Sequence, residues 1–377
     1  MKLGRAIAVL AALLLVTAAC GGSNGTVRPT PFATPGSALN PTPGSSSSSP
    51  SASPSSGTPS AGTSSDLAID GEHAIAVSVP DPNKALSYAA TDDALYRPQD
   101  SGGWDQIGSW DPSRSLLVDP TNQNVLYSGG HPGCAVGGPA IPLQKSIDGG
   151  NTWSTLLTGQ NVRPMIVDPA NPQVIYGERC SLAISVNGGQ TWTDYAMTPS
   201  FNVTDMSLVG TTLYVLITSE GGTSRIKTID VSDPSNASLG DDLHEFWGGG
   251  TLIASTDRLV IGEPHGIDVS TDGGKTWTFS RAGLETVTVS VNALAQPIQK
   301  DELSRKFGIY ALAVDPRDAS HLMAGTIRGL YESKDGGKTW SRVMQIDEVQ
   351  IDHLAFAQGG TLLYVVTDGA VTVLHNP

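Results

Sequence analysis

One eight-residue pattern occurs four times in this chain, and no other feature constrains the fold as strongly. It reads Ser-x-Asp/Asn-Gly-Gly-x-Thr-Trp and occupies residues 146–153, 185–192, 270–277 and 333–340, with a degenerate copy that ends at Trp104. The paired glycines allow positive φ, the Asp and hydroxyl side chains bond turn amides, and the Trp supplies an apolar plug. The pattern therefore predicts one tight turn that is rebuilt in each unit of a repeated architecture.

A second element precedes several of these turns. It is an apolar run that ends in Asp-Pro and leads into another apolar run, at 116–130, 165–178 and 312–326, with a degenerate version at 77–91. Because Pro fixes φ and Asp bonds nearby backbone, Asp-Pro marks a turn between two strands. Two strands around this turn and two around the Gly-Gly turn make four strands in about 40 residues, which is one blade of a β-propeller.

The spacing of the turns indicates the number of blades. The four patterns begin 39, 85 and 63 residues apart, so the second interval hides a blade with a decayed pattern near 212–236, and the third holds extra residues near 284–307. The last blade lacks a strand, and a strand near 66–73 would complete it and remove two sheet edges. We therefore expect an all-β fold with a single seven-bladed propeller, with six and eight blades as alternatives. The expected blades cover 74–110, 113–159, 161–198, 203–242, 248–283, 306–345 and 349–377.

The repeated turn resembles the Asp-box, or BNR, repeat of sialidases, xyloglucanases, sortilin ectodomains and photosystem II assembly-factor-like propellers. The resemblance covers about 66–377 and implies that the box lies between the third and fourth strands of a blade, away from any active site. The box residues are then structural. They are Ser146, Asp148, Gly150, Thr152, Trp153, Ser185, Asn187, Gly189, Thr191, Trp192, Ser270, Asp272, Gly274, Thr276, Trp277, Ser333, Asp335, Gly337, Thr339 and Trp340.

The N-terminus is expected to be a targeting segment. Lys2 and Arg5 precede a 12-residue apolar run at 6–17, which is too short to span a bilayer as a helix, and small residues lead to Cys20. This resembles a bacterial lipoprotein signal, in which residues 1–19 are removed and Cys20 carries the lipid. An ordinary secretory signal with an incidental Cys is the alternative. A lipid anchor would hold the protein on the extracytoplasmic side of a cell membrane.

Residues 20–65 are expected to form a disordered linker after the lipidated Cys. Of the 45 residues at 21–65, 39 are Ser, Thr, Pro, Gly or Ala, eight are Pro, and Arg28 carries the only charge. So few apolar side chains cannot offset the entropy of ordering the segment. The linker would act as a stalk that lifts the propeller at 66–377 from the membrane.

Two further cysteines, Cys134 and Cys180, follow the second strands of two adjacent predicted blades. Equivalent loops of neighbouring blades lie close together, and an oxidising compartment favours a disulfide between them. Two separate thiols are the alternative. No spacing of Cys and His indicates a metal site, and no motif indicates a cofactor.

A binding site is expected on the face opposite the boxes, where the second-to-third-strand turns and the blade connections lie. Several ionisable residues map to these loops, and four arginines there would suit a carboxylate-bearing ligand or an acidic protein patch. Ordinary surface arginines paired with nearby acids are the alternative. The candidate ligand-binding residues are Arg114, Arg163, Glu178, Arg179, Glu263, His265 and Arg328.

The sequence leaves the activity open and favours a non-catalytic module that binds a protein or glycan at the cell surface. We expect this module to be a monomer. A glycoside hydrolase of sialidase-like or xyloglucanase-like type is the alternative, but the Arg-Ile-Pro signature and the paired catalytic residues cannot be assigned. A candidate catalytic acid would be Asp93, Asp111, Glu178 or Glu263. The net charge of −14 excludes a nucleic-acid phosphate backbone as the expected partner.

Overall fold

A computed structural model describes most of the repeat region. The described residues are 67–68, 74–78, 88–91, 94–99, 103–108, 115–130, 141–158, 162–179, 181–197, 201–219, 221–284, 308–346, 349–367 and 370–377. The chain divides into two units, Met1–Gly57 and Thr58–Pro377, and every described residue belongs to the second. The predicted signal, Cys20, the linker to residue 65, and Cys134 and Cys180 all lie outside the described residues.

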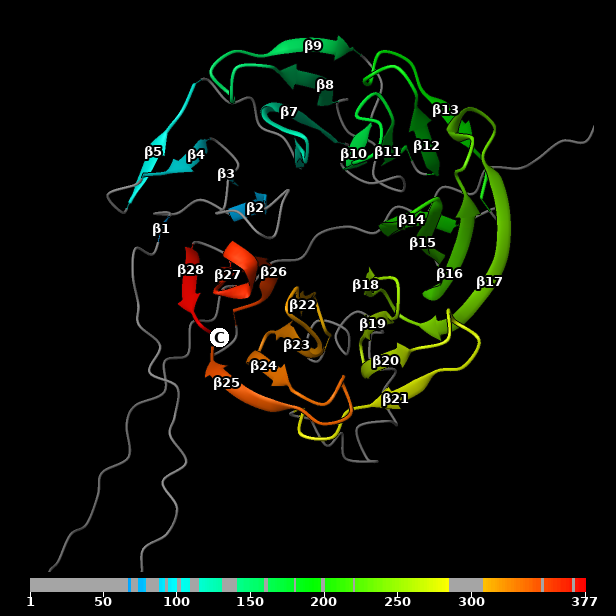
Figure 1. Ribbon diagram of the computed structural model, residues 1–377, viewed down its shortest axis with the longest axis vertical. Coiled ribbons are helices and arrows are strands. Elements are labelled where there is room, and N and C mark those ends of the chain that lie inside the picture. Colours follow the sequence, from blue (N-terminus) through cyan, green and yellow to red (C-terminus); the bar gives the residue numbers. More distant parts are fainter. Residues whose placement is uncertain are drawn as a thin grey trace, which may run out of the picture. The chain divides into compact units, whose positions relative to one another are not determined.

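The second unit consists of seven antiparallel sheets of four strands each, arranged as a ring (Figure 1). Blades 1 to 3 contain β2 (Ala74–Ser78), β3 (Tyr88–Thr91), β4 (Leu95–Pro98), β5 (Trp104–Gln106); β6 (Leu116–Asp119), β7 (Asn122–Gly130), β8 (Ile141–Ser146), β9 (Ser154–Leu157); β10 (Arg163–Val167), β11 (Ile175–Glu178), β12 (Leu182–Ser185) and β13 (Thr193–Tyr195). Blades 4 and 5 contain β14 (Phe201–Val209), β15 (Thr212–Ser219), β16 (Thr223–Asp230), β17 (Ser238–Trp247); β18 (Thr251–Ala254), β19 (Leu259–Glu263), β20 (Gly266–Ser270) and β21 (Thr278–Ser280).

The remaining strands complete the ring. They are β22 (Ala311–Asp315), β23 (Asp318–Thr326), β24 (Gly329–Ser333) and β25 (Ser341–Gln345) in blade 6, and β26 (Ile351–Ala357), β27 (Leu362–Thr367), β28 (Ala370–His375) and β1 (Leu67–Ala68) in blade 7. Two short 3-10 segments cover Pro234–Asn236 and Gln358–Gly360. Leu67 pairs with Val371 and Ala68 with Ala370, so the N-terminal strand completes blade 7 as predicted. The seven-bladed count is confirmed.

The core lies between the blades. The first strand of each blade faces the centre of the ring, where it contacts the first strands of its neighbours, and the fourth strand lies on the rim (Figure 1). The second strands β11, β19 and β27 are buried along their whole length, because each sheet is covered on both faces by another sheet. The cluster that contains Tyr176, Leu182, Leu213 and Ile217 is one such interface, between blades 3 and 4.

Blade 4 differs from the sequence prediction. The predicted blade ended at 242 and the next began at 248, whereas Ser238–Trp247 forms the fourth strand β17, paired with β16 from Asp230–Ser238 to Thr223–Trp247. The first five residues of β17 are exposed, since the outermost strand of a blade faces solvent on one side. The sequence of a polar outermost strand that follows no Gly-Gly pattern is typical of a loop.

No helix within the described residues is long and apolar enough to cross a membrane.

Candidate functional site

The Asp-boxes form closed hydrogen-bonded turns between the third and fourth strands, as the resemblance implied. In the blade 5 box, Ser270 Oγ donates to Asp272 Oδ1 at 2.8 Å, and the Thr276 amide and hydroxyl donate to the two Asp272 oxygens at 2.9 and 2.6 Å. The indole Nε1 of Trp277 donates to Gly274 O at 3.0 Å. Asn187 replaces the Asp in the blade 3 box and keeps the contact of its Oδ1 with the Thr191 amide at 2.9 Å.

The box carboxylates are committed to these turns. The hydroxyl and amide of Thr276 hold the pKa of Asp272 down at about 2, and those of Thr339 do the same for Asp335. These side chains position the turn, and the candidate ligand site therefore lies on the opposite face. That face contains the ends of the second strands, because turns at alternate ends join successive antiparallel strands.

Glutamates end the second strands of blades 3 and 5. Glu178 ends β11 and is 3% exposed; Arg163, opposite it in register on β10, donates from Nε to its Oε1 at 2.9 Å. Arg163 Nη2 also donates to Thr204 O at 3.3 Å, on the first strand of blade 4. Arg163 and Glu178 therefore pair with each other, as the alternative of ordinary arginines beside nearby acids describes, and the contact of Arg163 with Thr204 O ties blade 3 to blade 4.

Asp205 extends these links to blade 5. Its Oδ2 accepts from the Leu252 amide at 2.8 Å and from the Thr251 hydroxyl at 3.1 Å, and its Oδ1 accepts from the Met206 amide at 2.8 Å. Burial raises the pKa of Asp205, and these hydrogen bonds oppose the rise. No sequence pattern points to Asp205, because its partners Thr251 and Leu252 come from the next blade.

Glu263, the equivalent glutamate of blade 5, has no such arginine or lysine partner among the described residues. Thr251 pairs with Gly262, so Gly250 lies opposite Glu263, at the position that Arg163 has in blade 3. A side chain does not fit at Gly250, because its Cβ would clash with Gly262 O. Glu263 is 8% exposed, and burial, followed by the nearby Asp268 charge, raises its pKa to about 7, against an opposing effect of His244. A carboxyl in this state is partly protonated near neutral pH and can donate a hydrogen bond.

His244 and Asp268 lie beside Glu263 at the interface of blades 4 and 5. His244 Nε2 is 3.0 Å from Asp268 Oδ2, and the His244 ring stacks on Trp277 with a centroid distance of 4.5 Å. Asp268 is 6% exposed. Sequence reasoning missed both residues; the one available signal was an Asp inside the otherwise apolar run Gly-Ile-Asp-Val-Ser of β20.

Trp247 and His265 form the outer layer of this region. Their rings stack with centroids 6.0 Å apart and an interplanar angle of 19°. Glu263 pairs with Gly266, so Pro264 and His265 are the two residues of the turn, and Pro264 approaches Gly248, directly after Trp247. We call Trp247, Glu263, Pro264 and His265 the blade 4–5 rim. His265 is exposed and Trp247 is partly exposed.

Among the described contacts, none links the other predicted site residues to the blade 4–5 rim. Arg179 is paired with Asp194 on the fourth strand of its own blade, with Nη1 and Oδ1 3.6 Å apart. Arg328 lies in the turn between β23 and β24, where its amide donates to Thr326 Oγ1 at 2.9 Å. Arg114, Asp93 and Asp111 lie outside the described residues. The convergence of the arginines on one ligand stays a prediction.

Within the described ranges, no group of three or more His, Cys, Asp or Glu side chains could hold a metal ion.

Comparison with known proteins identifies the family of the repeat and a similar protein. The BNR/Asp-box repeat family matches residues 331–342. A xyloglucanase from Paenibacillus sp is 26% identical over 305 residues, which is 74% of this chain and 27% of that protein. The chain thus spans about a quarter of the xyloglucanase.

Two solved structures share the propeller fold. YCF48 from Cyanidioschyzon merolae has a TM-score of 0.55 and 15% identity, with 84% of this chain and 99% of that chain covered. A YCF48 bound to D1 peptide has a TM-score of 0.56 and 14% identity, with 83% and 96% covered. At these identities the likeness concerns the fold alone.

Proposed function

We propose that this chain, which belongs to the BNR/Asp-box β-propeller family, is a non-catalytic binding module that captures a protein segment or a glycan through the face opposite its boxes. The blade 4–5 rim is the observation that carries the proposal. It combines a stacked aromatic pair, Trp247 and His265, with the Glu263 carboxyl in the same turn. Aromatic surface beside a few hydrogen-bonding groups is the usual composition of a ligand site.

The carboxyl groups of this face support binding over hydrolysis. Glycoside hydrolysis by the common mechanisms uses two carboxyls on either side of the scissile bond. Among the described carboxyls near the rim, Glu178 is bound to Arg163, and Asp268 is 6% exposed and contacts His244. Glu263 is the remaining one, and a single carboxyl does not make the pair.

A glycoside hydrolase is the alternative function, and one observation favours it. The pKa of Glu263, about 7, is that of a general acid working near neutral pH. The sequence similarity to a xyloglucanase points the same way, over a quarter of that protein's length. The likeness to a propeller solved with a bound peptide supports a protein ligand instead.

Paired binding and turnover measurements test the proposal. The wild-type chain, Trp247→Ala, Glu263→Gln and the control Leu239→Ala, which removes an exposed apolar side chain from the box end of β17, are compared on peptide and glycan arrays and on xyloglucan and chromogenic β-glucosides. We expect saturable binding that Trp247→Ala weakens and Leu239→Ala leaves unchanged, without turnover. Turnover that Glu263→Gln abolishes would establish the hydrolase instead. Binding that Trp247→Ala leaves unchanged would remove the rim from consideration.

The same proposal places the propeller on the extracytoplasmic side of a membrane, on a lipid carried by Cys20. The basic n-region, the short apolar run and the Pro- and Ser-rich stretch after Cys20 support it. Labelled palmitate should enter the wild-type chain in bacterial cells, and Cys20→Ala should lose the label and leave the membrane fraction.

Intact-mass analysis with and without reductant tests the proposed Cys134–Cys180 disulfide, and two thiols in the mature protein would contradict it.

A further inference from the structure

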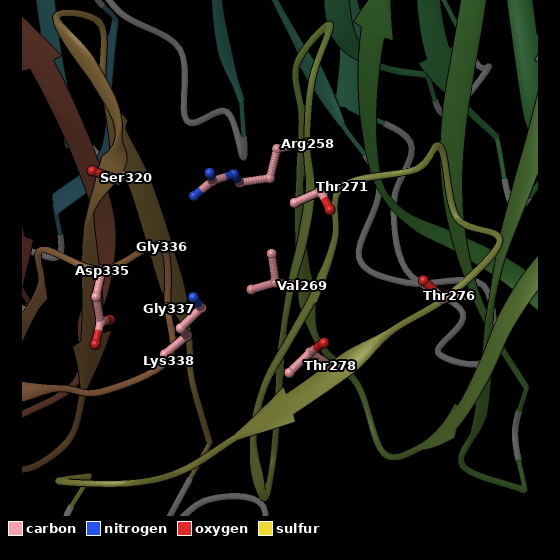
Figure 2. A pocket seen from close by; sticks show the side chains of 10 residues that line it. All are labelled: Arg258, Val269, Thr271, Thr276, Thr278, Ser320, Asp335, Gly336, Gly337 and Lys338. Atoms are coloured by element: carbon pink, nitrogen blue, oxygen red, sulfur yellow. The ribbon is translucent and has the colours of Figure 1, made fainter.

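A pocket of about 290 Å³ lies on the box face, between blades 5 and 6 (Figure 2). The turn between β18 and β19, the box of blade 5 and the box of blade 6 contribute its walls. The lining residues are Arg258, Val269, Thr271, Thr276, Thr278, Ser320, Asp335, Gly336, Gly337 and Lys338. Because the boxes and the second-to-third-strand turns are at opposite ends of the blades, this pocket is separate from the blade 4–5 rim.

Arg258 is the unusual member of this lining. Its Nε and Nη1 are buried and have no hydrogen-bond partner within the described part of the chain. The guanidinium lies against the first box glycine of blade 6, where a Cβ on Gly336 would be 2.9 Å from Nη1. Burying a charged group with unmet donors is costly unless a counter-charge reaches it. The missing partner is therefore an anion.

The protein does not lack acids to fill this role. The net charge is −14, with 36 Asp and Glu against 22 Lys and Arg. Four other described arginines are paired: Arg163 with Glu178, Arg179 with Asp194, Arg225 with Glu245, and Arg317 with Asp315. This chain has an excess of carboxylates, yet no described carboxylate pairs with the two buried nitrogens of the Arg258 guanidinium, so they are available to an anion from outside.

The other polar groups of the pocket suit the same ligand. Figure 2 shows the Lys338 ammonium and the Arg258 guanidinium on two sides of one space. Thr271 and Thr278 also line the pocket. Asp335 also lines the pocket, but Ser333 Oγ and the Thr339 amide donate to its Oδ1 at 2.8 and 2.9 Å, and the Thr339 hydroxyl donates to its Oδ2 at 2.6 Å. The carboxylate is thus occupied by its own turn.

We propose that this pocket binds one oxyanion group, a carboxylate, sulfate or phosphate, of a small ligand, with Arg258 as the principal contact and Lys338 as the second cation. Guanidinium groups are well matched to planar and tetrahedral oxyanions, which accept two N–H bonds at once. The volume is at the lower end for a small-molecule site, so it accommodates the charged group and a short attached fragment.

Calorimetric titration of the full chain with sodium sulfate, sodium phosphate and sodium glucuronate, each at an ionic strength matched with sodium chloride, tests the proposal. The variants are Arg258→Met, Lys338→Met and the control Arg225→Met, which removes the same charge from an ion pair on the surface of blade 4. Lys338 is exposed, so its replacement leaves folding intact. Thermal unfolding of each variant without probe verifies the fold.

We expect saturable binding of at least one probe to the wild type and to Arg225→Met. Arg258→Met should weaken it at least about tenfold, or about 1.4 kcal/mol, and Lys338→Met should weaken it less. The preferred probe distinguishes carboxylate from tetrahedral oxyanion. Equal affinity in the wild type and Arg258→Met, or saturable binding of none of the three probes, would overturn the proposal. Trp247→Ala should leave probe affinity unchanged, so the rim and this pocket succeed or fail separately.

Discussion

Arg163 and Glu178 face each other across β10 and β11 with 2.9 Å between Nε and Oε1, and blade 5 repeats the glutamate as Glu263 but has Gly250 in place of the arginine. The glutamate of blade 3 thus has an arginine partner, whereas burial and the nearby Asp268 charge raise the pKa of Glu263 in blade 5 to about 7. The difference makes the two positions natural controls for each other.

Removing the cation from blade 3 should expose the cost of burying Glu178. Arg163→Met leaves a carboxylate that is 3% exposed without its partner, and we expect a loss of about 3 kcal/mol in the free energy of unfolding. The double variant Arg163→Met/Glu178→Gln should recover most of that loss. Urea denaturation of the four proteins of this cycle measures the coupling. A double variant no more stable than Arg163→Met would contradict the explanation.

Glu263 should make the protein less stable as pH rises. Its folded-state pKa is raised from 4.5 to about 7, so the folded state holds the proton more tightly than the unfolded state. The resulting stabilisation is complete below pH 4.5 and is lost as pH rises through 7. Glu263→Gln should remove this dependence and stabilise the protein at pH 8 by on the order of 2 kcal/mol. Unfolding curves from pH 5 to 8 test this, with the exposed Glu245→Gln as control; parallel curves for Glu263→Gln and wild type would refute it.

The boxes should tolerate an amide in place of the carboxylate. In the blade 3 box, the Thr191 amide donates to Asn187 Oδ1. The equivalent bond in the blade 5 box runs from the Thr276 amide to Asp272 Oδ1. Asp272→Asn should therefore lower Tm only slightly, whereas Asp272→Ala leaves the amide and hydroxyl of Thr276 without their acceptor and should lower it more. Differential scanning calorimetry ranks the three proteins. Equal Tm values for the Asn and Ala variants would show that the box hydrogen bonds do not stabilise the blade.

The first glycines of two boxes separate backbone strain from steric conflict. Gly273 and Gly336 have φ of 74° and 76°, but a Cβ at Gly273 would meet nothing within 4 Å, while one at Gly336 would meet Arg258. Gly273→Ala should cost about 1 kcal/mol of stability from strain alone, and Gly336→Ala should cost more. In an Arg258→Met background the two costs should become similar, as measured by urea denaturation. A difference that persists in that background would mean that Arg258 is not the cause.

Much of the fold is readable in the sequence because a propeller repeats one local solution. The Ser, Asp and Thr side chains of the Ser-x-Asp-Gly-Gly-x-Thr-Trp turn find their hydrogen-bond partners within the same eight residues, so the chemistry of the turn is visible wherever the pattern occurs. The seven blades and the N-terminal strand that completes blade 7 followed from the spacing of such turns. The strand β17 was not predicted, because an outermost strand that exposes polar residues has no apolar pattern.

The blades, the boxes and the face on which Arg163, Glu178, Glu263 and His265 lie could be predicted from the sequence, because they depend on turns and alternation along one strand. Which side chains meet between blades depends on how the separate sheets pack. His244 reaches Asp268 across 24 residues, Trp247 stacks on His265 in the next blade, and Arg258 lies near Gly336 with its Nε and Nη1 unpaired among the described residues. Such contacts depend on the register and packing of separate sheets, which no local pattern specifies.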